Sequence, residues 1–261
     1  MTTKGTLNTE NDYFSSSLEN EVLVVRQKQH ILYLTQELED CFSLYRYMDL
    51  LSSNDSYNAM VMFVNSQQIS QIEYGCFMSK VLSGKWESTE LERFLNVVNM
   101  LFLRLSTLNR MTVFAGQGIL SLFYLNIGLA HDYRIVAEDT VFENLNAHMG
   151  LVTKGSGYFL PRLLGIQKAT EVLQWKSFSA EDALELGLVD RIVPVSRLEE
   201  ETMQFVLADP VYSSSTLLGI RKLLKCDAKE LKRSLDLEDC LIKEYRKSAE
   251  IKERSLRILK S

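Results

Sequence analysis

The fold is decided by residues 111–194, which read MTVFAGQGILSLFYLNIGLAHDYRIVAEDTVFENLNAHMGLVTKGSGYFLPRLLGIQKATEVLQWKSFSAEDALELGLVDRIVP. The apolar runs of this stretch predict strands over 112–115, 133–137, 140–144 and 188–193, with helices between them. Strands and helices that alternate across short glycine turns are typical of an α/β layer structure. In such a structure, a helix that begins directly after a tight turn offers unpaired backbone N–H groups to an anionic oxygen.

The amino-terminal part of the chain predicts further elements of the same layer structure. Residues 1–19 are polar and without an apolar period, which predicts a flexible N-terminus. The runs VLVVRQK and HILYLT predict a first β-hairpin, and residues 59–64 predict a buried strand. Residues 88–108 carry apolar side chains at helical spacing and predict an amphipathic helix.

The carboxy-terminal part is predicted to be helical. From residue 196 onward, charged and apolar residues alternate at helical spacing. No linker rich in proline or glycine divides the chain. We therefore expect a flexible segment over 1–19, an α/β core over 20–195 and a helical region over 196–261.

Composition limits the classes of function. The chain has 261 residues, of which 46% are hydrophobic and 24% charged, as is ordinary for a globular protein. A net charge of −5 gives no electrostatic reason to expect nucleic acid or an anionic membrane as a partner. We find no apolar run long enough to span a bilayer and no start typical of a signal peptide. The four cysteines lack metal-ligand spacing, so no metal site is expected. Without an export signal, they are most simply free thiols in a cytoplasmic protein.

The central stretch also carries a family pattern. Its most specific part is SAEDALELGLVDRIVP, residues 179–194. Further matching positions are Gly118, Asp132, Phe142, Gly150, Gly155, Gly157, Arg162, Leu163 and Gly165. With these motifs the chain resembles the crotonase (enoyl-CoA hydratase/isomerase) superfamily. The resemblance implies a ββα spiral, whose C-terminal helical region would mediate assembly into a homotrimer or a dimer of trimers.

The resemblance also implies a chemistry. Enzymes of this superfamily hold an acyl-CoA or acyl-carrier thioester and stabilise an enolate-like oxyanion with two backbone N–H donors. Coenzyme A enters as part of the substrate, so no separate cofactor is expected. The family's pattern puts the first donor of this oxyanion hole at Gln67 and the second at Phe123.

The turn around the second donor departs from the family's pattern. Leu122, Phe123 and Tyr124 stand where the family has three glycines. A backbone N–H is retained with any side chain except proline, but three bulky side chains would fill the space through which substrate approaches. The alternative interpretation is that LSLFYL is simply a buried helix of the core.

The two glutamates that transfer protons in the family's hydratases fall on Asn126 and Asn146. A side-chain amide cannot transfer a proton near neutral pH, although it can hold a water or a thioester oxygen by hydrogen bond. The alternative for Asn126 is a hydrogen bond within the core. His148 is expected on the same side as Asn146, which makes it either a replacement acid–base group or a structural histidine. Glu143 is expected on the opposite side.

The remaining candidates concern binding rather than proton transfer. The resemblance makes Tyr124, Glu143, Gly150 and Gly155 candidate substrate-binding residues, and Asp132 matches an aspartate that we interpret as structural. The two amino-terminal loops that wrap coenzyme A in the family are altered, since the arginine–proline pair and the glycine–alanine–aspartate turn are both missing.

Two hypotheses of different classes follow. In the first, which is the working hypothesis, the protein acts on an acyl thioester through an oxyanion-stabilised enolate, with altered acid–base groups. In the second, it is a catalytically inactive crotonase-fold partner subunit. Fold alone does not decide between them.

Overall fold

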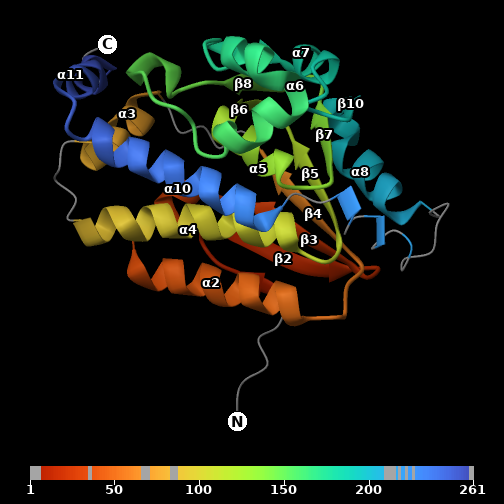
Figure 1. Cartoon of the computed structure of the whole chain (residues 1–261). Helices are drawn as coiled ribbons and strands as arrows, with labels where there is room; N and C mark the ends of the chain where they lie inside the picture. The colour runs from red at the N-terminus through yellow and green to blue at the C-terminus, as the bar shows by residue number, and fades with distance from the viewer. Residues whose placement is uncertain are drawn as a thin grey trace.

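The computed structural model describes residues 7–34, 37–65, 71–82, 88–208, 216, 219–220, 223–224 and 227–258. Within these residues the chain is a mixed α/β fold with two sheets and covering helices (Figure 1). The larger sheet has seven strands in the order β1-β2-β3-β4-β5-β7-β10, and the smaller has three in the order β6-β8-β9. The α/β class that the sequence predicts is confirmed.

The larger sheet is parallel except at its amino-terminal edge. Its central strands read as continuous apolar runs, such as AMVMFV in β4, because side chains on both faces are buried. The strands of this sheet are β1 (Thr9–Glu10), β2 (Phe14–Glu19), β3 (Val22–Gln27), β4 (Ala59–Val64), β5 (Met111–Gly116), β7 (Tyr133–Ala137) and β10 (Arg191–Val193). Those of the smaller sheet are β6 (Ile119–Ser121), β8 (Val141–Glu143) and β9 (Ser177–Ser179).

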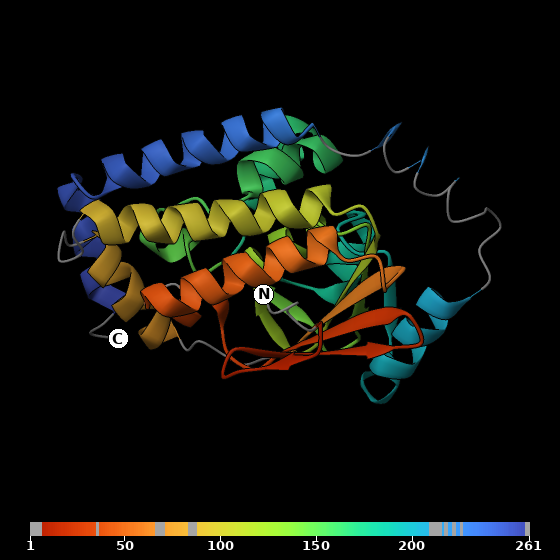
Figure 2. The same ribbon diagram turned by 90° about the horizontal axis from the view of Figure 1, so that it is seen from below.

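Helices cover both faces of the larger sheet. In Figures 1 and 2, α2, α4 and α10 lie side by side in one layer, while α8 lies near β5 and β7. The α-helices are α1 (Ile31–Leu34), α2 (Leu38–Ser53), α3 (Gln71–Leu82), α4 (Ser88–Thr107), α5 (Leu122–Leu129), α6 (Ser156–Val172), α7 (Ala180–Glu185), α8 (Leu198–Leu207), α10 (Ala228–Tyr245) and α11 (Ala249–Ile258). Two short 3-10 helices are η1 (Ala147–Met149) and η2 (Val195–Arg197).

One expectation about the amino-terminal part of the chain was wrong, namely which segments form the first hairpin. Its strands are β2 and β3, which pair along the whole length of β2. The hairpin between them turns at Asn20 and Glu21, which both have positive φ, as a two-residue hairpin turn requires. HILYLT therefore does not form the second hairpin strand, and four of its residues form α1 (Ile31–Leu34). The serines of β2 give this strand no apolar pattern in the sequence, and its stability comes from pairing with the apolar β3.

The C-terminal helices fold back onto their own chain. Helix α10 packs against α4 and α6, and α11 packs against α3 and η1. These contacts bring residues near the end of the chain to the turn before α6. The helical character predicted for the region after residue 196 is confirmed for α8, α10 and α11.

Candidate functional site

The position of the second predicted donor lies in the first turn of α5. Strand β6 ends at Ser121, and the helix begins at Leu122, so Phe123 is its second residue. First-turn N–H groups have no partner within the helix, and the Ser121 side chain makes no capping bond. The local backbone therefore has the geometry of a helix start that can donate N–H groups.

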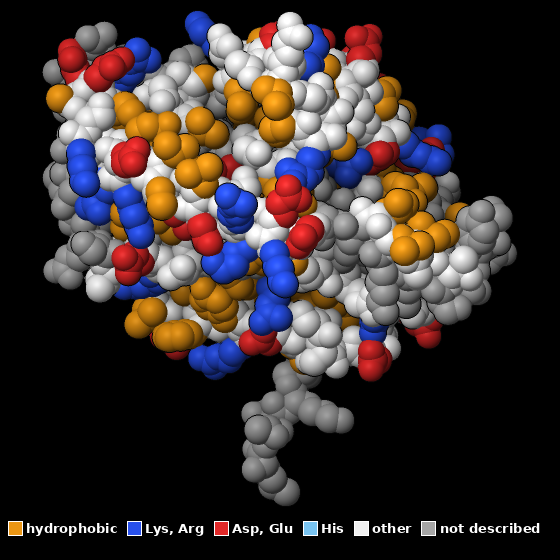
Figure 3. Space-filling model, viewed as in Figure 1, with side chains coloured by type: hydrophobic (Ala, Val, Ile, Leu, Met, Phe, Trp, Pro, Cys, Tyr) orange, Lys and Arg blue, Asp and Glu red, His pale blue; other side chains and the backbone are white. Residues whose placement is uncertain are grey.

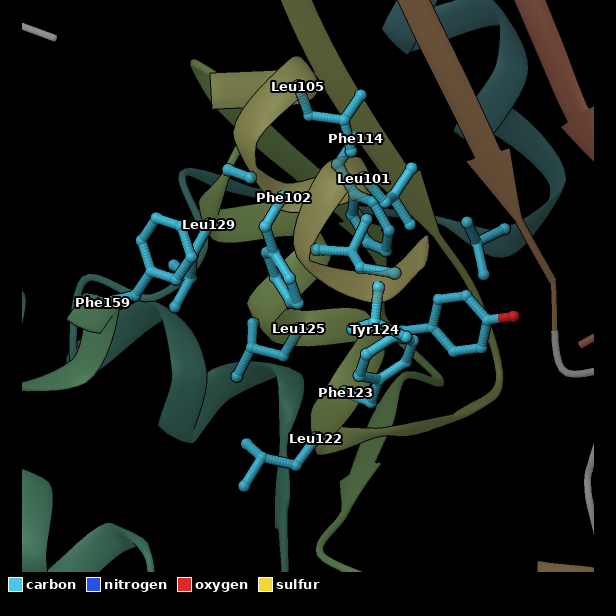
Figure 4. Close-up of a cluster of buried hydrophobic side chains, with 14 of the residues drawn as sticks. Leu101, Phe102, Leu105, Phe114, Leu122, Phe123, Tyr124, Leu125, Leu129 and Phe159 are labelled. Carbon is cyan, nitrogen blue, oxygen red and sulfur yellow. The ribbon is translucent and has the colours of Figure 1, made fainter. Parts of the chain in front are cut away.

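The side chain of Phe123 is buried in the protein interior. Only 7% of it is exposed, and its ring lies 5.9 Å from the ring of Phe102 and 6.4 Å from that of His30. Figure 4 shows Phe123 and Tyr124 on α5, next to Phe102 and Leu101 from α4. The chain's own aromatic rings thus occupy the space that glycines would leave open.

The second bulky residue of this turn, Tyr124, is held by its hydroxyl group. The Tyr124 oxygen accepts a hydrogen bond from the backbone N–H of Ile31 at 3.0 Å and another from the Gln27 amide. These bonds tie α5 to the chain segment between β3 and α1. Burial raises the pKa of the Tyr124 hydroxyl above its usual range, so the group stays protonated.

Asn126 is fully buried one helical turn further along. Its amide nitrogen donates to the carbonyl of Lys154 at 2.9 Å and to the hydroxyl of Ser156 at 2.8 Å. The side chain therefore fixes α5 to the turn before α6. This geometry is the hydrogen bond within the core that we considered as the alternative for Asn126.

Asn146 is also buried and has partners on both ends of its amide. Its oxygen accepts from the Tyr74 hydroxyl of α3, and its nitrogen donates to the Thr153 hydroxyl at 3.0 Å. Burial raises the pKa of Tyr74, which keeps this hydroxyl protonated as a donor. Both ends of the Asn146 amide are thus engaged inside the protein.

The turn before α6 contains a group that sequence reasoning missed. The carboxylate of Glu238, from α10, accepts hydrogen bonds from the N–H groups of Gly155 and Gly157, each at 2.9 Å. Gly155 has φ +87°, and a Cβ there would lie 2.9 Å from the Phe102 ring, so glycine is required. The chain's own carboxylate therefore occupies the anion-binding start of α6.

A buried lysine completes this cluster. Lys154 donates from Nζ to Asp239 at 2.6 Å and to the carbonyl of Leu235 at 2.9 Å, and it lies 3.5 Å from Glu238. Burial raises the pKa of the Glu238 carboxyl, while Lys154 and the two glycine N–H groups act against this rise. In the sequence Glu238 is one of many charged residues in a helical run, so no sequence pattern predicts its contact with the turn before α6.

His30 is a further buried group that sequence reasoning did not single out. It is 4% exposed, its ring lies 4.8 Å from that of Tyr124, and Nδ1 accepts from the N–H of Leu32 at 3.3 Å. Burial lowers the pKa of His30 to about 4. The folded protein therefore keeps this ring neutral under conditions in which the unfolded chain takes up a proton.

A loss of stability at acid pH follows from His30. Because its pKa is lower in the folded state, stability is complete above pH of about 6.5 and falls as the pH drops toward 4. His30→Gln should remove about 2.5 kcal/mol from the difference in unfolding free energy between pH 7 and pH 4.5. Urea denaturation of both proteins at the two pH values measures this, and an unchanged difference would contradict it.

The remaining predicted residues are dispersed or lie outside the described part. Gln67 lies outside the described residues, and so does the side chain of His148, whose backbone belongs to η1. Glu143 is half-buried in β8, opposite Ser121 of β6. Gly150 ends η1 with φ +73°.

Asp132 and the neighbouring strand have the arrangement expected of a structural pair. The Asp132 carboxylate accepts from the N–H of Thr112 at 2.6 Å and from its hydroxyl at 2.9 Å. In return, its N–H donates to the carbonyl of Thr112. These bonds join the start of β5 to the turn before β7.

Among the described residues, no helix is both long and apolar enough to cross a membrane. Nor do His, Cys, Asp and Glu side chains gather there in a group of three that could hold a metal ion.

Solved structures share this fold. An enoyl-CoA hydratase from Bacillus halodurans is 24% identical, with a TM-score of 0.78, and the match covers 94% of this chain and 99% of that one. For an enoyl-CoA hydratase from Mycobacterium avium subsp. paratuberculosis, the identity is 18%, the TM-score 0.72 and the coverage 95% of both chains. An enoyl-CoA hydratase/isomerase from Pseudoalteromonas atlantica matches at 20% identity and TM-score 0.68, over 95% of this chain and 96% of that one. The predicted crotonase-like fold is confirmed.

The sequence itself matches a family model. The model of the enoyl-CoA hydratase/isomerase family matches residues 87–258, which is more than half of the chain. The match includes α5, the turn before α6 and α10. The chain belongs to the enoyl-CoA hydratase/isomerase family.

Proposed function

We propose that this protein is a non-catalytic member of its family and serves as a subunit in an assembly of crotonase-fold chains. The observation that carries the proposal is the buried Phe123 ring, which packs on Phe102 and His30 beside the N–H that would hold a thioester oxygen. A donor can stabilise an oxyanion only if that oxygen comes within about 3 Å of it. The proposal is that this buried ring excludes the thioester oxygen from the N–H of Phe123.

The two amides support the same proposal. Asn126 and Asn146 stand where the family's hydratases have glutamates, and each makes two hydrogen bonds to other groups of the chain. Neither can transfer a proton. Their hydrogen bonds connect α3, α5 and the turn before α6, which supports a role in holding the fold.

An apolar surface supports the role as a subunit. On α6, Ile166 is 80% exposed and Leu163 is 50% exposed, and Figure 3 shows hydrophobic side chains gathered over this helix. Exposed apolar patches often mark surfaces that another chain covers. We propose that this surface contacts neighbouring subunits in a homotrimer or a dimer of trimers, or in a complex with an active relative.

A charge on this surface should break the assembly. Ile166→Glu would bury a carboxylate in the apolar contact, so the variant is expected to elute at the mass of a single chain. Gln167→Glu, on an exposed neighbouring position, is the matched control and should leave the mass unchanged. Size-exclusion chromatography with light scattering measures both, and an identical mass for the two variants would refute this contact.

A second candidate is the working hypothesis of an enzyme with altered acid–base groups, and Glu238 is the observation that favours it. This carboxyl lies at the turn before α6, and burial raises its pKa above the usual value. Perturbed carboxyl groups of this kind occur at sites of proton transfer. The substrate would be an acyl-CoA or acyl-carrier thioester, and His148 would be a second candidate group. Turnover of any such thioester that Glu238→Gln abolishes would favour this enzyme. The cytoplasm remains the predicted location in either case.

A further inference from the structure

Tyr124 also lines an apolar cavity between α2, α4 and the larger sheet, with a volume of about 60 Å³. Most of the lining is aliphatic, from residues that include Val25, Leu44, Met48, Met60 and Leu101. No charged side chain is among the lining residues of the described chain, and neither are Phe123, Asn126 and Asn146. Of the described residues aligned with the family's site, only Tyr124 lines the cavity, and none of those assigned to oxyanion binding or proton transfer does. An inference about the cavity does not depend on the function proposed above.

One wall of the cavity offers a buried hydrogen-bond acceptor. Gln27 is 8% exposed, and its nitrogen donates to the carbonyl of Gln29 at 2.9 Å and to the Tyr124 hydroxyl. The Gln29 carbonyl can only accept, so it fixes which end of the amide is the nitrogen. The other end, Oε1, is buried and has no hydrogen-bond partner within the described part of the chain.

The same wall offers a hydrogen-bond donor. Both hydrogen bonds of the Tyr124 hydroxyl within the described residues, from Ile31 and from Gln27, use its oxygen as the acceptor. The hydroxyl proton is therefore left for another partner. Burial raises the pKa of this group, so the proton is retained throughout the physiological range.

We propose that this cavity binds a short aliphatic alcohol. Its hydroxyl group accepts from the Tyr124 O–H and donates to Gln27 Oε1, and its carbon chain lies against Met48 and Met60. A neutral ligand fits because the lining carries no charge. The ligand must be short because this cavity is several times smaller than the sites of drug-sized ligands, which have volumes of about 300 Å³ or more. A thioester carbonyl would not complete the pair, since it accepts but cannot donate.

Three methionines make the proposal directly testable. Met48, Met60 and Met62 line the cavity, whereas Met78, Met149 and Met203 do not and serve as internal controls. In the full chain with carbon-13 methionine methyl groups, ethanol should shift the first three resonances saturably. Its isomer dimethyl ether, which accepts but cannot donate, should bind about fivefold more weakly.

Two variants separate the donor from the acceptor. Tyr124→Phe should weaken both ligands about fivefold, whereas Gln27→Leu should weaken only ethanol. If either variant fails to fold, the affinities of the wild-type protein for the alcohol and for the ether still test the proposal. Absent shifts, equal shifts of all six methionines, or equal affinities for alcohol and ether would each overturn the proposal.

Discussion

Hydration of crotonyl-CoA by this protein is expected at the uncatalysed rate. A positioned acid–base group typically contributes about a hundredfold to ten-thousandfold, and an oxyanion donor about a hundredfold to a thousandfold. Asn126 and Asn146 cannot supply the first contribution, and the function proposed above requires that the buried Phe123 side chain excludes the second. The combined loss is about ten-thousandfold or more relative to an active hydratase.

The hydration assay has a direct positive control. The enoyl-CoA hydratase from Bacillus halodurans, which shares the fold, can be assayed in parallel at the same concentration. The double variant Asn126→Glu with Asn146→Glu should remain inactive, because it leaves the buried Phe123 side chain, which is proposed to exclude the thioester, unchanged. Rapid hydration by the wild-type chain would show that the assignment of these positions is wrong.

Removing the amino group of Lys154 is expected to give the largest loss of stability. Lys154→Met leaves the buried Glu238 and the partly buried Asp239 without their cation. Breaking a buried ion pair in this way costs about 3 to 5 kcal/mol, because the remaining charge is uncompensated. For a chain of this size the melting temperature should fall by about 10 °C.

The Lys154 prediction has a matched control and a rescue. Lys168→Met makes the same change at the exposed Lys168–Glu171 pair and should cost about 1 kcal/mol or less. Adding Asp239→Asn to Lys154→Met should recover part of the stability, because one of the two uncompensated charges is removed. Differential scanning calorimetry measures all of these variants. Equal effects at Lys154 and Lys168 would show that the buried cluster does not hold α10 in place.

Much of the fold could be predicted because its central elements follow local sequence rules. The apolar run of β4 and the helical spacing of α4 give nearly the same bounds in the sequence and in the structure. The N-terminal hairpin could not be predicted in this way. Its outer strand, β2, contains three consecutive serines and is stabilised by pairing with β3, which is a tertiary effect.

The candidate site could be predicted only in part. Aligning Phe123, Asn126 and Asn146 with the family's motifs identified positions that proved to be buried, but their partners come from distant segments. Tyr74 and Glu238 reach the site from α3 and α10, more than 70 residues away along the chain. No local sequence pattern predicts such contacts, because they depend on how the helices pack against one another.

The most direct test of the proposed exclusion of a thioester is a calorimetric titration of the wild-type protein with crotonyl-CoA and with coenzyme A. On the proposal that the buried Phe123 side chain excludes the thioester carbonyl, we predict no saturable heat of binding and no rise in unfolding free energy with either ligand. Saturable binding of crotonyl-CoA would contradict the account. Such binding would raise the unfolding free energy by about 2.7 kcal/mol at a hundredfold excess over Kd.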